Sequence, residues 1–297
     1  MISGDEIRNL RGLQVCNYSS MGALTFTVFE IILSIDEEVE QIWRKPWTNL
    51  KRLYLIIRII SLGSQFISTG ITLSSPREAT HSLRDCRMLA GFQGASSQVL
   101  MMAVQVILVL RVQALYYENT SLKYTLYGLF FAEVVAMTLL FALSMPGILY
   151  GSHCVITSFP GIASGFLVSP ILFELLLFVM TMIKFYNTVR EGWGEEHVLS
   201  RFLKDGVWAF ALPFIMLIVN TFCMTFLSGA LASVAYSWAI AIPGFAGCRL
   251  ILNMSHLLER NETFPRSSAV ADTLIFTDGA ATDLNTYELY GTTHSSS

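Results

Sequence analysis

Long apolar runs separated by short charged segments are the feature that most limits what this chain can fold into. A helix that crosses about 30 Å of hydrocarbon needs about 20 mainly apolar residues. Runs of that length predict an all-α fold, a polytopic transmembrane bundle of seven helices. Strands of a membrane barrel would instead alternate in hydrophobicity, and the run IMLIVNTFCMTFL does not alternate. The predicted spans are residues 13–35, 53–73, 88–110, 124–145, 161–183, 207–227 and 231–252.

The composition excludes the common soluble classes. Only 14% of the 297 residues are charged and 53% are hydrophobic, whereas soluble domains carry about 25% charged residues. The net charge of -3 also excludes a basic nucleic-acid-binding surface. We therefore expect an integral multi-pass protein of the plasma membrane or an endomembrane, with the lipid bilayer as its main partner.

The distribution of lysine and arginine predicts the orientation of the bundle, because these residues are retained on the cytoplasmic side during insertion. Thirteen of them fall on the side of the C-terminus and five on the side of the N-terminus. We expect the N-terminus outside and the C-terminus in the cytosol. The predicted organisation is a short outer segment at 1–12, a membrane domain at 13–252 and a disordered, Ser/Thr-rich cytosolic tail at 253–297.

Two cysteines fall at the predicted outer face. Cys86 lies at the start of the third span, and Cys154 lies in the loop between the fourth and fifth spans. Disulfides persist in oxidising compartments, so we predict a Cys86–Cys154 bridge that ties this loop to the third helix. Two alternatives stay open: the residues could be unrelated small side chains, or Cys16, also near the outer face, could pair with either of them.

Two charges of opposite sign lie at equal depth in neighbouring spans. Glu30 lies five residues before the cytosolic end of the first span, and Arg58 lies five residues into the second. At about 1.5 Å per residue both are about 7 Å deep. An ionisable side chain inside a span costs about 2.5 to 3.5 kcal/mol. We predict a buried Glu30–Arg58 ion pair; the alternative is that Arg58 extends to the lipid headgroups.

Two further carboxylic acids lie near the middle of the bilayer. Glu133 is in the fourth span and Glu174 is in the fifth, and neither has an obvious cationic partner at its depth. Each could be hydrogen-bonded to a neighbouring helix, or could serve as a proton or cation site.

The third span carries small and polar residues on one face. Gly91, Gly94, Gln98 and Gln105 are three, four and seven residues apart and therefore share a helical face. Such residues mark helix contacts in membranes. We expect the third span to be central, with this face turned inward.

Catalytic and cofactor motifs are absent from the sequence. The Walker A, H-E-x-x-H and G-x-S-x-G patterns do not occur, and the five histidines lack metal-ligand spacing. We expect no enzymatic activity, no cofactor and no metal.

A charged segment with two tryptophans follows the first span. In residues 35–47, IDEEVEQIWRKPW, Trp43 and Trp47 are one helical turn apart. Tryptophan favours the membrane interface. We expect an extension of the first helix that turns at Pro46 into the headgroup layer.

This segment also carries a family resemblance. FEIILSIDEEVEQIWRKPW and the following KRLYLIIRI are similar to a pattern of Glu-Val-Glu-x-Ile-Trp-Lys with a nearby Trp, then Lys-x-Leu-Phe-Leu with Arg soon after. The pattern is that of a large family of seven-helix membrane proteins from mushroom-forming fungi, defined by an N-terminal domain of unknown function. Glu30 stands where that family usually has Asp. The matching residues are Glu38, Glu40, Trp43, Trp47 and Arg58.

The resemblance continues at two cytosolic span ends, with Arg111 in LRVQALY and Arg249 in CRLILN. It covers about residues 20–255, with the family domain at about 20–65, and implies a seven-helix protein with no assigned activity. The topology, Arg111 and the expected disulfide also look like heptahelical receptors, although Leu110 replaces the expected acidic residue and the seventh span lacks Asn-Pro-x-x-Tyr.

Three functions follow as hypotheses. The first is a receptor-like sensor that binds an unidentified ligand and signals to a cytosolic partner. The second is a proton- or cation-coupled transporter or channel using Glu133 and Glu174. The third is a structural membrane scaffold without a ligand.

Overall fold

The computed structural model describes residues 4–44, 47–74, 83–116, 120–150, 154, 156–158, 160–190, 197–227 and 229–263. Within these residues the chain forms seven α-helices joined by shorter elements. The helices are α1 (Gly4–Glu38), α2 (Asn49–Ser74), α3 (Leu83–Leu115), α4 (Thr120–Ser144), α5 (Gly161–Arg190), α6 (His197–Phe226) and α7 (Tyr236–Thr263). The shorter elements are the π-helix η1 (Val39–Trp43), the 3₁₀ helices η2 (Met145–Gly147) and η5 (Gly229–Ser233), and strands β1 (Leu149–Tyr150) and β2 (Ile156–Ser158).

The predicted all-α bundle of seven helices is confirmed. Six described helical segments are long and apolar enough to cross a membrane. The seventh, the described apolar part of α6 at Phe210–Phe226, is shorter. The protein is therefore an integral multi-pass membrane protein, as its composition predicted.

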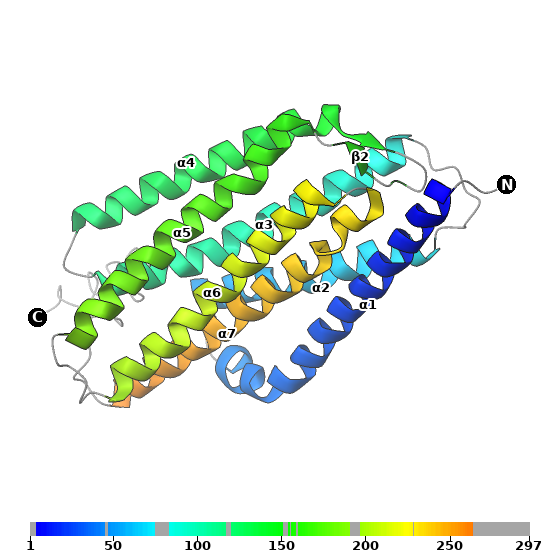
Figure 1. Ribbon diagram of the computed structural model, residues 1–297. Helices are drawn as coiled ribbons and strands as arrows, with labels where there is room; N and C mark the ends of the chain where they lie inside the picture. The colour runs from blue at the N-terminus through cyan, green and yellow to red at the C-terminus, as the bar shows by residue number, and fades with distance from the viewer. Residues whose placement is uncertain are drawn as a thin grey trace, which may run out of the picture.

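The helices run roughly along one common direction, and the short elements gather at the two ends (Figure 1). The start of α1 and strand β2 lie at one end, which we call the hairpin end. The π-helix η1 and the last turns of α7 lie toward the other, which we call the η1 end. Because the number of helices is odd, the first and last helices begin and finish at opposite ends.

Helix α3 is the centre of the bundle. It packs against α2, α4, α5 and α7. The other helices contact the helices that precede and follow them in sequence, and α1 also contacts α7. In the apolar window of α3, 67% of the residues are buried, against 17% in α4. The expected central position of the third span is thus observed.

Two glycines allow close helix contacts. A Cβ atom on Gly94 of α3 would lie 2.8 Å from Phe141 Cζ on α4, and one on Gly244 of α7 would lie 2.9 Å from Ser61 Cβ on α2. Small residues at such contacts let helix backbones approach closely in membranes.

The outward faces carry large apolar side chains. Ile59 on α2, Phe131 on α4 and Leu172 on α5 are 67%, 70% and 62% exposed. Large exposed apolar side chains on several helices are unusual for a soluble monomer. They form the surface expected of helices surrounded by lipid.

The helical part of the chain is longer than the predicted membrane domain. Helix α1 already begins at Gly4, so the outer segment expected at 1–12 is mostly helix, and α7 continues to Thr263, beyond the boundary expected at 252. A helix that has formed extends at little cost per residue, so its ends need not coincide with the ends of the apolar run. The rest of the tail, residues 264–297, lies outside the described residues.

Candidate functional site

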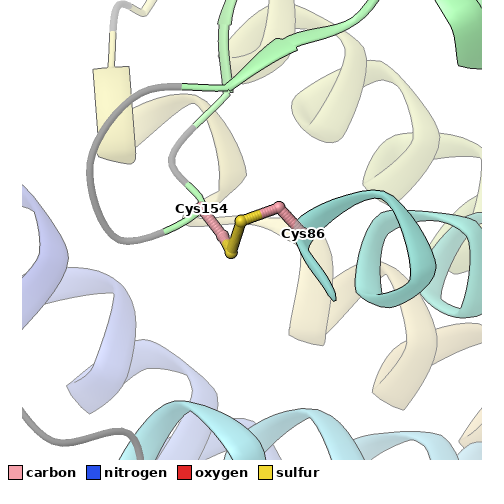
Figure 2. Close-up of a disulfide and its surroundings, with 2 residues drawn as sticks. All are labelled: Cys86 and Cys154. Atoms are coloured by element: carbon pink, nitrogen blue, oxygen red, sulfur yellow. A yellow bond between two sulfur atoms is a disulfide. The ribbon is translucent and has the colours of Figure 1, made fainter. Parts of the chain in front are cut away.

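A disulfide at the hairpin end fixes the connection between α4 and α5 to α3. Cys86, in the first turn of α3, is bonded to Cys154, which lies between β1 and β2 (Figure 2). Their Cα atoms are 5.0 Å apart, and 68 positions separate them in sequence. The structure therefore contains the predicted bridge. The competing Cys16 is a free thiol that donates to the Ala230 carbonyl at 2.9 Å.

The hairpin itself is short and antiparallel. Leu149 lies opposite Ser158, and Tyr150 lies opposite Ile156. Cys154 has a φ of 57°, in the left-handed region that costs a non-glycine residue about 1–2 kcal/mol. Strand β2 also contacts η5. The hairpin thus connects α3 to the segment that leads into α7.

At the other end, Arg58 of α2 binds two carboxylates of α1. Its Nη1 donates to Glu30 Oε2 at 2.5 Å, and its Nη2 donates to the Ser34 hydroxyl at 2.7 Å and to Glu38 Oε1. The Ser34 hydroxyl in turn donates to Glu38 Oε1 at 2.9 Å. Since these three α1 residues follow one another at intervals of four, they lie on one helical face.

Arg249 of α7 reaches the same helix from another side. Its Nη1 donates to Glu37 Oε2 at 3.0 Å, and its Nε lies 3.5 Å from Glu30 Oε1. Glu30 therefore bridges the two arginines and connects α1 with both α2 and α7. We call these side chains the ionic cluster: Glu30, Ser34, Glu37, Glu38, Arg58 and Arg249.

The ionic cluster is larger than the pair predicted from sequence. The structure brings Glu30 and Arg58 together, and it adds Glu38 and Arg249, which the family resemblance had pointed to without a contact between them. Sequence reasoning missed Ser34 and Glu37. The four-residue spacing from Glu30 through Ser34 was a signal that could have found the first of them.

A pocket about the size of one water molecule lies beside the ionic cluster. Glu30, Arg58, Ser61 and Cys248 contribute to its walls. Such a space suits a bound water or a small rearrangement of the arginine, and it is too small for an organic ligand.

The charged segment after α1 continues the helix, as expected, in the form of the π-helix η1, and the turn expected at Pro46 lies outside the described residues. Trp43 and Trp47 are 57% and 67% exposed. Lys51 Nζ lies 4.7 Å from the centre of the Trp47 ring and 6.0 Å from that of Trp43, within cation–π range. Glu40 is exposed on η1. This exposed aromatic surface is typical of the membrane interface.

The polar residues of α3 pair with α4 in the interior of the bundle. Gln98 Nε2 donates to the Thr138 hydroxyl at 2.8 Å, and Gln105 Nε2 donates to Glu133 Oε1 at 3.0 Å. Gln105 is fully buried. The predicted inward face is therefore observed for these two glutamines, whereas a Cβ on Gly91 would meet open space.

Glu174 of α5 is only 2% exposed, and among the described residues neither of its carboxyl oxygens has a hydrogen-bond partner. Its sequence neighbour Phe173 packs against Phe130 of α4, with ring centres 5.9 Å apart. Glu133 accepts from Gln105 through one oxygen and leaves the other without a donor. The two acids that the sequence placed near mid-membrane thus lie at a similar level on neighbouring helices.

Arg111 is buried in the last turns of α3, and it is separate from the contacts that define the ionic cluster. Across the part of the chain that the structure describes, no group of three or more His, Cys, Asp or Glu side chains is arranged to hold a metal ion.

A family match lies in the first quarter of the chain. Residues 18–63 match a family of unknown function (DUF6533). This range runs from α1 through η1 into α2 and includes every member of the ionic cluster except Arg249. No curated protein matches the chain. The domain expected at about 20–65 is therefore confirmed, and the protein is a multi-pass membrane protein with a domain of unknown function.

Proposed function

We propose that the protein is a receptor-like sensor, which binds a ligand at the hairpin end and passes a signal to a cytosolic partner at the η1 end. The observation that carries the proposal is the bond between the hairpin and α3. A ligand that moves the hairpin pulls on the first turn of the most buried helix, because Cys154 is covalently joined to Cys86.

The ionic cluster supplies the element that such a signal would change. It joins α1, α2 and α7 through two arginines and three carboxylates. Arg249 is the more exposed arginine, with 34% of its side chain accessible, so its contacts cost less to break. A shift of α7 away from α1 would release Arg249 and leave Arg58 in place, which gives two arrangements of the same helices.

The proposed orientation places the N-terminus and the hairpin outside and the end of α7 in the cytosol. The excess of lysine and arginine on the side of the C-terminus supports it. A disulfide at the hairpin end agrees with an oxidising outer compartment. The resemblance to seven-helix proteins of mushroom-forming fungi supports the same topology, and the proposal includes no catalytic step.

Proximity labelling tests the proposal. A biotin ligase fused to the C-terminus of the full chain should label a cytosolic protein, and Arg249→Gln should change the amount labelled because it weakens the contact of α7 with α1. Ile59→Ala is the matched control, since Ile59 lies next to Arg58 and faces lipid. If no cytosolic protein is enriched with the wild type or with Arg249→Gln, the sensor is refuted and a ligand-free scaffold is favoured.

A transport function is the second candidate, and the carboxyl groups of Glu133 and Glu174 favour it. Cation flux into proteoliposomes that is abolished by Glu174→Gln would support transport. Flux no greater than in empty liposomes would exclude it.

A further inference from the structure

We propose that Gln105, Glu133 and Glu174 form a binding site for one monovalent cation, sodium, in the interior of the bundle between α3, α4 and α5. The inference goes beyond the proposed sensor, because it concerns binding by residues that belong to neither the hairpin nor the ionic cluster. It does not require that the protein signals or transports.

The first step is the position of the three side chains. Gln105 Nε2 donates to Glu133 Oε1 at 3.0 Å, which joins α3 to α4. Phe130 of α4 and Phe173 of α5 have ring centres 5.9 Å apart, and Glu133 and Glu174 follow them closely in sequence. Three neighbouring helices therefore direct oxygen-bearing side chains to one level of the bundle.

The second step is the set of oxygens that no protein donor satisfies. In the described residues, the unpaired oxygens are Gln105 Oε1, Glu133 Oε2 and both carboxyl oxygens of Glu174. Gln105 is fully buried and Glu174 is 2% exposed. Buried polar atoms are normally hydrogen-bonded, so several unpaired acceptors at one level of the bundle indicate a missing positive species.

The third step is the chemistry of that species. Carboxylate and amide oxygens bind hard cations. A divalent metal ion usually binds three or more carboxylate, imidazole or thiolate side chains. The described residues contain no group of three or more His, Cys, Asp or Glu side chains arranged in this way. Two carboxyl groups and one amide suit a small monovalent ion. Protonation of a carboxyl group is the competing way to remove the unbalanced charge.

Thermal unfolding in nanodiscs distinguishes sodium from a proton. The full chain is heated in NaCl and in choline chloride at equal ionic strength, since choline is a quaternary ammonium ion much larger than sodium. At a sodium concentration about ten times the Kd, we expect a Tm about 3 °C higher in NaCl. Glu174→Gln and Glu133→Gln should each abolish this difference.

Gln98→Met is the matched control, because Gln98 also bonds α3 to α4 but has no carboxyl partner there. It should keep the sodium response. Glu174→Gln should be at least as stable as the wild type in choline chloride, because Glu174 loses no hydrogen bond on substitution. If that variant does not fold, Glu133→Gln carries the same test.

Infrared difference spectra give a second reading. Sodium should convert a protonated carboxyl band of the wild type into a carboxylate band, and Glu174→Gln should remove that change. The proposal is overturned if NaCl and choline chloride give the same Tm and spectra at every pH, which means that the acids bind protons only. It is also overturned if both Gln variants keep the sodium response.

Discussion

Replacement of Arg58 by glutamine should be the most destabilising single change in the ionic cluster. The guanidinium is the donor for Glu30, Ser34 and Glu38, and these groups are buried. Glutamine has a polar but shorter side chain than arginine, and it carries no positive charge. Two carboxylates then remain at the α1–α2 contact with one arginine fewer.

The magnitude follows from what each carboxylate retains. Removal of one partner from a buried ion pair costs about 3–5 kcal/mol. Glu30 keeps Arg249 at 3.5 Å, and Glu38 keeps the Ser34 hydroxyl at 2.9 Å, so the lower end applies. We expect a loss of about 3 kcal/mol. Arg249→Gln breaks a more exposed contact, to a Glu37 side chain that is 52% exposed, and should cost at most about 1 kcal/mol.

A thiol-reactive dye can follow unfolding, because Cys248 is buried beside the ionic cluster. A loss of about 3 kcal/mol corresponds to a Tm lower by roughly 6–12 °C. Arg58→Lys should fall between wild type and Arg58→Gln, because lysine keeps the charge but cannot bind Glu30 and Glu38 with a planar fork. If Arg58→Gln lowers the Tm no more than Arg249→Gln does, the ionic cluster does not hold α1 to α2.

Three further results are expected. Cys154→Ser should lower the free energy of unfolding by up to about 4 kcal/mol, because the disulfide closes a loop of 68 residues. Wild-type protein treated with a reductant should have the same Tm as the variant, and a different Tm would contradict this prediction. Gly244→Ala should lower the Tm, since its Cβ would lie 2.9 Å from Ser61 Cβ, whereas Gly63→Ala has open space and should be neutral; equal effects would refute the close contact. Asn119 should carry no glycan in mass spectra of the protein from eukaryotic cells, because the proposed orientation puts the α3–α4 connection in the cytosol; a glycan there would invert the orientation.

The helices could be predicted because membrane insertion is a local property of sequence. An apolar run of sufficient length identifies a span without knowledge of its neighbours. The disulfide and the Glu30–Arg58 contact could also be predicted, since each follows from the expected position of two residues across the membrane in the predicted topology. The depth of a residue in the membrane can be estimated from the sequence, because it follows from the number of residues between that position and the end of the span.

Contacts that depend on helix rotation could not be predicted in the same way. Arg249 reaches Glu37 only because α7 packs against α1, and those residues are far apart in sequence. The face of α3 that carries Gln105 was evident, but its partner Glu133 depends on which side of α4 turns inward. The apolar character of α4 all round its surface leaves that choice to packing.

The position of Arg249 has a consequence for how the chain is made. A membrane protein emerges from the ribosome N-terminal end first, so α1 and α2 can pair through Glu30 and Arg58 while later helices are still being synthesised. Arg249 lies on the last helix and comes from outside the matched segment at 18–63. Glu37 therefore gains its arginine only after α7 has been synthesised, and a chain truncated before α7 keeps the α1–α2 ion pair but lacks the one that joins α1 to the last helix.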